Sequence, residues 1–184
     1  MNKNPFLYLK SAACTVRFRL HGCQVAVVAC EGKIPVLAGP GAVRIGKRFV
    51  VRGSIMRCEL SVGRNAQLLI GDRVFLNQGV VIAVQESVEI GDDTLIGDFS
   101  AIYDANWHRL EPDRPDKPRP VSIGKNVWLG NHVLVLPGSK IGDHTVVAAR
   151  SVVKGTLPPR VLAAGNPAVV VKELDIPDDD WRRG

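Results

Sequence analysis

Residues 123–158 read IGKNVW LGNHVL VLPGSK IGDHTV VAARSV VKGTLP, six consecutive units of six residues. Each unit opens with an aliphatic residue, at Ile123, Leu129, Val135, Ile141, Val147 and Val153. A period of six matches neither the turn of an α-helix nor the strict alternation of an amphipathic strand. It fits a short strand followed by a tight corner, with the aliphatic side chain inside and Gly, Asn and Asp allowing the turn.

Three such units close a triangular coil, and successive coils stack through backbone hydrogen bonds about 4.8 Å apart. The eighteen-residue coil predicts three stacked pairs, which are Ile123 on Ile141, Leu129 on Val147 and Val135 on Val153. Aliphatic-Gly pairs at 45–46, 62–63, 70–71, 90–91 and 96–97 carry the pattern toward the N-terminus. The sequence therefore predicts an all-β protein, a parallel β-helix of hexapeptide repeats.

The repeat is interrupted in two places. Ile82 and Ile90 are eight residues apart, so two residues are inserted at a corner. Residues 108–122 (HRLEPDRPDKPRPVS) fit no unit and contain four prolines and seven charged residues, which cannot continue a coil. We expect an extruded loop at 108–122, and a long loop within a compact repeat usually serves function.

The two ends of the chain lack clear repeats, as the caps of a solenoid should. We expect residues 1–40 to form an N-terminal cap with a short helix and irregular strands. The β-helix should occupy 41–158, and residues 159–184 should form a C-terminal cap and tail.

Composition narrows the class of protein. The chain has 184 residues, enough for one domain, with 46% hydrophobic and only 5% aromatic residues. Its four cysteines, Cys14, Cys23, Cys30 and Cys58, form no C-x-x-C pair, and the first residues lack a continuous apolar segment. These features predict a cytoplasmic protein with reduced thiols. The net charge of +6 suits anionic ligands, but no stacking aromatics accompany the basic residues, which argues against nucleic acid.

Three segments together resemble a known family. They are Tyr103-Asp104-Ala105-Asn106-Trp107-His108, the run IGKNVWLGN at 123–131, and LPPRVLAAGNPA at 157–168. From about Val43 to Glu173 the chain resembles the sugar O-acetyltransferase branch of the hexapeptide-repeat acyltransferases. The resemblance implies a left-handed β-helix, a homotrimer with active sites between subunits, acetyl-CoA as acyl donor, and no metal requirement.

The resemblance also implies roles for individual residues. His108 would be the general base that takes the proton of the attacking hydroxyl, since imidazole, with an ordinary pKa of about 6.5, suits this task at neutral pH. The backbone N–H of Asn131 would stabilise the oxyanion. Asn77 aligns with an Asn that contacts the acceptor. Asp104 and Asn106 would orient the imidazole or bind a sugar hydroxyl, unless they serve the corner itself.

Coenzyme A would run along the late coils, against Gly130, Asn131, Ala148 and Ala149. Trp128 would line the groove near the thioester, where the substrates meet, unless it packs between subunits. Lys154 and Lys172 are candidates for its phosphates. Two positions depart from the family pattern, since Arg150 stands where a Gly is usual and Val169 where a basic residue is common. Arg150 would then either replace the missing phosphate contact or alter the groove.

Other functions on the same fold are weighed against this one. A γ-type carbonic anhydrase needs three convergent histidines. Here His132 should stack over Arg150 and His144 over Asn126, on different sides of the coil.

The acceptor is expected to be a sugar hydroxyl of a surface polysaccharide or its precursor, and the basic charge suits an anionic acceptor at a membrane surface. N-acetylation of an amino sugar and a non-catalytic trimeric scaffold remain alternatives.

Overall fold

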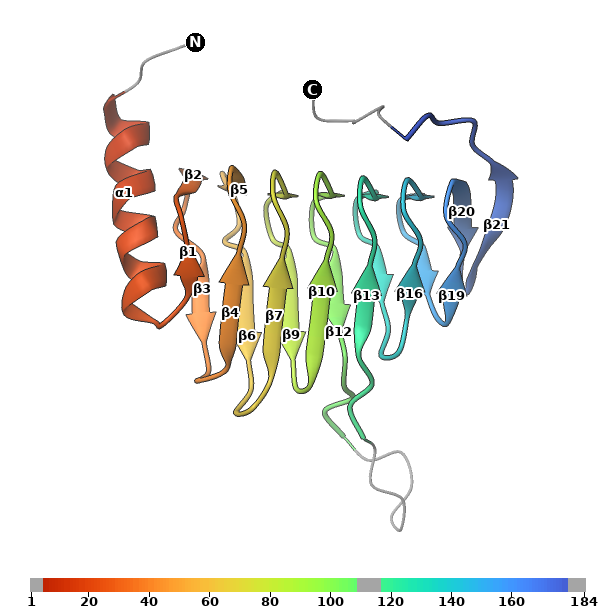
Figure 1. The fold of residues 1–184 in the computed structure, drawn as a ribbon, viewed down its shortest axis with the longest axis horizontal. Helices are drawn as coiled ribbons and strands as arrows, with labels where there is room; N and C mark the ends of the chain where they lie inside the picture. The colour runs from red at the N-terminus through yellow and green to blue at the C-terminus, as the bar shows by residue number, and fades with distance from the viewer. Residues whose placement is uncertain (1–4, 109–116, 179–184) are drawn as a thin grey trace.

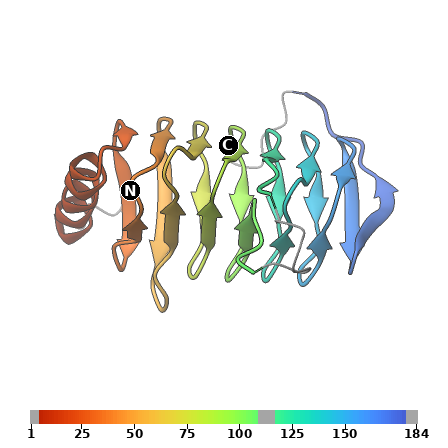
Figure 2. The same cartoon turned by 90° about the horizontal axis from the view of Figure 1, so that it is seen from below.

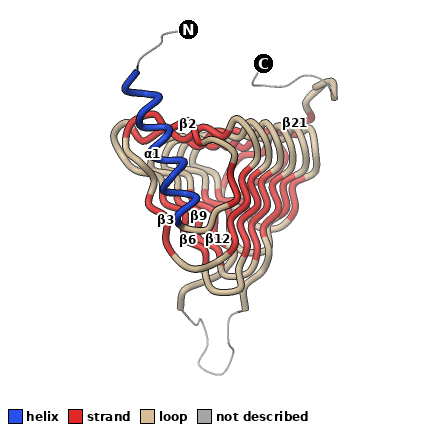
Figure 3. Tube along the Cα trace, turned by 60° about the vertical axis from the view of Figure 1, so that its left-hand side comes forward, coloured by secondary structure: helices blue, strands red, loops and turns tan. Residues whose placement is uncertain are grey.

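The computed structural model, which describes residues 5–108 and 117–178, shows a triangular prism of stacked parallel strands (Figures 1 and 3). The helix α1 (Pro5–Leu20) covers one end, and the strand β21 (Ala168–Glu173) closes the other. Within these residues three strands make each coil, and six full coils are stacked. The described part contains no helix long and apolar enough to cross a membrane.

Each side of the prism is one sheet, named here A, B and C. Sheet A contains β1 (Gln24–Val25), β4 (Ala42–Ile45), β7 (Gln67–Ile70), β10 (Ser87–Ile90), β13 (Val121–Ile123), β16 (Lys140–Ile141) and β19 (Thr156–Leu157). Sheet B contains β2 (Val28–Gly32), β5 (Phe49–Gly53), β8 (Phe75–Leu76), β11 (Leu95–Ile96), β14 (Trp128–Leu129), β17 (Val146–Val147), β20 (Val161–Gly165) and β21. Sheet C contains β3 (Val36–Ala38), β6 (Glu59–Val62), β9 (Val81–Val84), β12 (Ala101–Tyr103), β15 (Leu134–Val135) and β18 (Val152–Val153).

The stacking predicted from the hexads is confirmed in all three sheets. Ile123 pairs with Ile141, Leu129 with Val147, and Val135 with Val153, always in parallel. All six side chains are buried in one continuous core. The architecture is consistent with a left-handed β-helix. Its interior is a set of aliphatic ladders, because the inward residue of each strand rests on its counterpart one coil away.

The glycine of the aliphatic-Gly pair has a different role from the one expected. The residues with positive φ lie two positions after it and are mostly not glycine, for example Arg73 (φ 57°) and His132 (φ 58°). The glycine is instead a site of close approach. A Cβ on Gly97 would lie 2.6 Å from the Oδ1 atom of Asn131, and a Cβ on Gly71 would overlap Asp92 Oδ1. The hexad glycine therefore makes room for a polar side chain on the next coil.

The β-helix begins earlier than the repeats indicated. Strands β1, β2 and β3 lie within the segment expected as a cap, yet each pairs in parallel with the strand one coil further on. Only α1 is a true cap, and it packs on the first coil through the buried side chains of Cys14 and Phe18. At the other end β21 turns back antiparallel to β20, and this ends the parallel stacking of sheet B.

The corner between sheets C and A carries both interruptions. The two extra residues after Ile82 lie between β9 and β10, as predicted. The larger excursion leaves the coil after β12, and β13 starts at Val121, so the last two residues assigned to the loop belong to a strand. Residues 109–116 of the predicted loop lie outside the described residues, and residues 117–120 form no strand.

Candidate active site

A shallow groove of about 270 Å³ runs along the late coils at the outer face of sheet B and its corner with sheet C. Its walls are small or apolar, apart from one amide side chain; the lining is Trp128, Gly130, Asn131, Val146, Val147, Ala148 and Ala149. Five residues assigned to coenzyme A from the sequence, or to the groove near its thioester, thus lie together. The indole of Trp128 is 47% exposed and forms one wall of the groove.

A backbone contact repeats along the corners of the prism, most often between sheets A and B. At several corners the residue after the hexad glycine donates its N–H to an Asp or Asn one coil away. Lys47 donates to Asp72 Oδ1 at 2.7 Å, and Lys125 donates to Asp143 Oδ1 at 2.8 Å. Each of these bonds satisfies a backbone donor that the turn leaves out of the sheets.

Asn131 takes part in this pattern as an acceptor but not as a donor. Its own Oδ1 accepts the N–H of Asp98 at 3.1 Å, so it serves the coil before it. The residue facing it on the next coil is Ala149, which has no side-chain oxygen. Within the described residues the N–H of Asn131 therefore has no acceptor. The N–H of Asp92 opposite Lys125 also lacks one, so it is the adjoining groove that distinguishes Asn131.

His108 lies at a different corner, after the end of β12 where sheet C gives way to sheet A. Its side chain is exposed, and the preceding Trp107 is 55% exposed. The C side of the fifth coil spans residues 133–137, which is about 16 Å at roughly 3.3 Å per residue. His108 and Asn131 therefore occupy opposite edges of sheet C, and a single chain does not bring them to one point.

Asp104 does not reach the surface that an acceptor could contact. Its side chain is fully buried. Its Oδ1 accepts the N–H of Gln85 at 2.7 Å, and its Oδ2 accepts those of Glu86 at 2.7 Å and Ser87 at 2.8 Å. Of the roles expected for Asp104, these contacts fit the one in the corner itself. The excursion that carries His108 begins just after β12. Asp104 holds this start of the excursion against the inserted corner of the preceding coil, at Gln85–Ser87.

The remaining acceptor candidates lie apart. Asn77 is half-buried in the corner between sheets B and C, two coils before Gly130 in the same column, and its Oδ1 accepts the N–H of Gln78 at 3.0 Å. Asn106 is exposed near His108, at the other edge of sheet C. Asn77 therefore lies at the same corner as Asn131, and Asn106 lies at the same corner as His108.

The basic candidates for phosphate contacts are also divided. Arg150 adjoins the groove, since its N–H donates to the carbonyl of Asn131 at 2.9 Å, and its side chain is exposed. Lys172 is exposed on β21, the last strand of sheet B. Lys154 is exposed at the corner of sheets C and A, away from the groove of its own chain.

The structure also shows an aromatic stack next to Asn131, which the sequence analysis does not predict. The rings of Phe99 and His132 stack with centroids 5.3 Å apart, and a Cβ on Gly79 would overlap the Phe99 ring. These residues and Arg150 each lie three positions after an inward aliphatic residue. That constant offset is the signal in the sequence that identifies them as one column on the surface.

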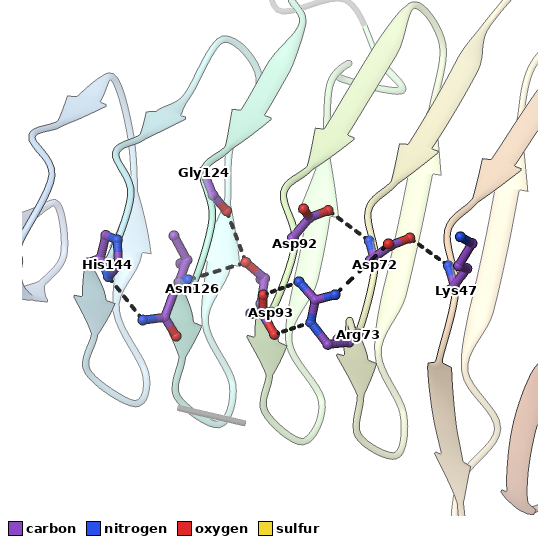
Figure 4. Close-up of polar contacts among 10 residues, drawn as sticks. Lys47, Asp72, Arg73, Asp92, Asp93, Gly124, Asn126 and His144 are labelled. Carbon is purple, nitrogen blue, oxygen red and sulfur yellow. Dashed lines mark hydrogen bonds and ion pairs between the residues drawn. The ribbon is translucent and has the colours of Figure 1, made fainter. Parts of the chain in front are cut away.

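The equivalent column at the corner of sheets A and B is polar, and its Asp93, Asn126 and His144 are buried (Figure 4). Arg73 donates two hydrogen bonds of 2.7 Å to Asp93, which is 1% exposed. This pairing raises the pKa of Arg73 above its ordinary value. The amide of Asn126 lies 3.0 Å from His144 Nδ1, which confirms the predicted stacking of His144 over Asn126. His144 and His132 thus occupy different corners, as expected.

The fold and the groove define a hexapeptide-repeat transferase, and comparison with known proteins agrees. Residues 120–155 match the family model described as bacterial transferase hexapeptide (six repeats). The provisionally named lipopolysaccharide biosynthesis O-acetyl transferase WbbJ of Escherichia coli K12 is 32% identical over 190 residues, covering 97% of this chain and 93% of WbbJ. The chain therefore belongs to the hexapeptide-repeat acetyltransferase family.

Further relatives cover less of the chain or resemble it less closely. Galactoside O-acetyltransferase of E. coli K12 is 37% identical over 115 residues, which is 61% of this chain and 57% of that protein. The hexapeptide-repeat acetyltransferase VCA0836 of Vibrio cholerae, solved with acetyl coenzyme A, has a TM-score of 0.55 and 26% identity over 81% of this chain and 72% of its own. The N-acyltransferase AntD of Bacillus cereus, solved with dTDP and coenzyme A, has a TM-score of 0.67 at 23% identity, covers 83% of both chains and shares the fold.

Proposed function

We propose that the protein transfers the acetyl group of acetyl-CoA to a hydroxyl of a sugar, in a surface polysaccharide or its precursor, in the cytoplasm. The observation that carries the proposal is the N–H of Asn131, which has no acceptor among the residues that the structure describes and lies at the edge of a groove walled by Trp128 and small residues. The names of WbbJ and of galactoside O-acetyltransferase support a sugar as acceptor. VCA0836, which was solved with acetyl-CoA, supports the donor.

The chemistry follows from the two sides of the proposed site. His108 takes the proton of the sugar hydroxyl as its oxygen attacks the thioester carbonyl. The carbonyl oxygen becomes an oxyanion, and the N–H of Asn131 stabilises it. The tetrahedral intermediate then collapses, the C–S bond breaks, and the thiolate of coenzyme A receives the proton from the imidazolium. The products are an acetyl ester and free coenzyme A, with no change in oxidation state.

The separation of the two groups supports a site between chains. His108 and Asn131 lie at opposite edges of sheet C, about 16 Å apart along the chain's own surface. We infer a homotrimer in which the His108 corner of one chain meets the Asn131 corner of its neighbour. Each interface would then hold one complete site. In this arrangement Asn77 and Asn106 contact the acceptor, and Arg150, Lys154 and Lys172 contact the phosphates of coenzyme A.

The first experiment measures release of the coenzyme A thiol from acetyl-CoA, with and without a panel of glycan acceptors. The proposal requires release that is stimulated by an acceptor in the wild type and reduced by roughly 10²-fold or more in His108→Ala. Equal stimulation in both proteins would remove His108 from the role of base. A trimer without turnover or acetyl-CoA binding would instead favour a scaffold.

A second experiment tests the role of the Asn131 N–H by substituting Ala149, the residue that faces it on the next coil. Ala149→Asp places a carboxylate opposite this N–H, as Asp143 stands opposite Lys125. It should occupy the donor, fill the groove and abolish acetyl-CoA turnover without loss of stability. Lys125→Asp is the matched control, because it introduces the same contact opposite Asp92, away from the groove. Full activity in Ala149→Asp would refute the assignment of Asn131.

N-acylation of an amino sugar is the second candidate, favoured by the similarity of fold to AntD. An amine acceptor already carries a lone pair once it is deprotonated, so it depends less on a base. The acceptor panel therefore includes amino sugars and their nucleotide-linked forms. Turnover restricted to these compounds, with an acid-stable and base-stable product, would replace the O-acetyl proposal.

A further inference from the structure

The helix α1 has two apolar faces, and the coil covers only one of them. The inward face contributes Cys14 and Phe18, both fully buried against the first coil. Leu9, Ala13, Val16 and Leu20 are spaced four, three and four residues apart, which places them together on the opposite side. The large side chains there are strongly exposed, with Leu9 at 68%, Val16 at 54% and Leu20 at 81%.

A helix that is apolar on both faces normally lies in a protein interior or at a bilayer. α1 instead lies across the end of the prism, and its outward face points away from every coil (Figures 1 and 2). Nothing in the described part of the chain covers this face. The stripe formed by Leu9, Ala13, Val16 and Leu20, called the α1 stripe below, is thus an exposed apolar surface.

The charges of α1 indicate what covers the stripe. All charged side chains of the helix are basic, namely Lys10, Arg17 and Arg19. Lys10 and Arg17 are seven residues apart and border one edge of the stripe, and Arg19 borders the other. Arg19 is held in place by donating to the carbonyls of Val25, at 3.4 Å, and Ala26, at 2.5 Å.

A second copy of the chain matches this surface poorly. Two α1 stripes in contact would bring the basic borders of both helices together, with no acidic residue in either helix to compensate. An anionic bilayer satisfies both features, since it buries apolar side chains in the interface and attracts Lys and Arg at their borders. We propose that α1 lies in the plane of an anionic membrane surface, so that the N-terminal end of the prism faces the membrane.

The proposal is independent of the acyl-transfer chemistry. It predicts that the intact protein floats with vesicles of phosphatidylcholine containing roughly 30% phosphatidylglycerol and does not float with pure phosphatidylcholine. Raising the salt concentration should release it, because surface attraction is screened within a Debye length of about 10 Å at 0.1 M.

Paired variants separate the apolar and basic contributions. Leu9→Gln/Val16→Gln should weaken partitioning at least about tenfold, since both side chains lose their burial in the interface. The control Val169→Gln/Val171→Gln changes two side chains of similar exposure, 60% and 58%, at the far end of the prism, and should bind normally. Lys10→Gln/Arg17→Gln should weaken partitioning by roughly 30-fold, at about 1 kcal/mol per charge. Its control, Lys125→Gln/Lys140→Gln, removes two exposed charges from sheet A and its corner with sheet B, and should have little effect.

Three results would overturn the proposal. One is the absence of vesicle binding by the wild type. Another is an equal loss of binding in the β21 control and in the α1 variant. The third is a smaller oligomer for Leu9→Gln/Val16→Gln than for the wild type in light scattering, with equal vesicle binding by the two proteins, which would assign the α1 stripe to a second copy.

Discussion

Substitution of Asp104 by Asn separates the structural role of this residue from a role in substrate binding. The carboxylate is fully buried and accepts three backbone N–H groups of the inserted corner, from Gln85, Glu86 and Ser87. Asn keeps the shape of the side chain but replaces one acceptor oxygen with an NH₂ group. One or two of the three N–H groups then face a donor.

Each buried N–H left without an acceptor costs about 1–3 kcal/mol. Asp104→Asn should therefore destabilise the protein by roughly 2–4 kcal/mol. For a chain of this length 1 kcal/mol corresponds to about 2–4 °C, so the Tm should fall by roughly 5–15 °C. Because Asp104 fastens the segment that carries His108, turnover should fall as well, with the KM for acetyl-CoA unchanged.

Differential scanning calorimetry measures the change in Tm, and steady-state kinetics measures turnover. Asp143→Asn is the matched control, since this exposed carboxylate accepts a single N–H, from Lys125. It should cost less than about 1 kcal/mol. If Asp104→Asn kept the wild-type Tm and raised only the KM for the acceptor, Asp104 would be a sugar ligand and the structural assignment would be wrong.

Three further predictions concern the core and the corners. Leu129→Ala should lower the free energy of unfolding by about 2–5 kcal/mol in urea titrations, because it opens a cavity in a fully buried ladder, and a loss below 1 kcal/mol would contradict this packing. Gly79→Ala should cost at least about 1–2 kcal/mol, since its φ of 68° is strained for alanine and the new Cβ meets the ring of Phe99; an unchanged Tm and near-UV spectrum would argue against this close contact. Burial raises the pKa of Cys58 from its ordinary value of 9.0 to about 11, so its contribution to stability is complete below pH 9 and is lost as the pH rises toward 11. Unfolding free energies of the wild type and Cys58→Ala should therefore converge over this range by about 2–3 kcal/mol, and parallel pH profiles would exclude the shift.

The central coils were predictable because their spacing is regular. Eighteen residues separate Ile123 from Ile141, and the structure pairs them. The first coil was missed because its inward positions contain residues such as Val28 and Cys30 without a following glycine. Its strands depend on the neighbouring coil for their hydrogen bonds, and that dependence is tertiary information that a short segment does not carry.

The candidate site was predictable where it is made of backbone and small residues. Ala148 and Ala149, which the family resemblance assigns to coenzyme A, line the groove. The sequence left the role of Asp104 open between a ligand contact and the corner, since an Asp near a His is compatible with either. Its partners, the N–H groups around Glu86, come from an insertion in another coil.

The number of stacked coils fixes the distance between the N-terminal end of the prism and the groove. Four strand spacings separate β2, beneath α1, from β14, which carries the groove, and this amounts to about 19 Å. A coil cannot be added or removed by halves without breaking the ladders, so the height of the groove above the end of the prism can change only in steps of about 4.8 Å. For an enzyme standing on a membrane, the number of coils would then set how far from the lipid an acceptor must extend to be acetylated.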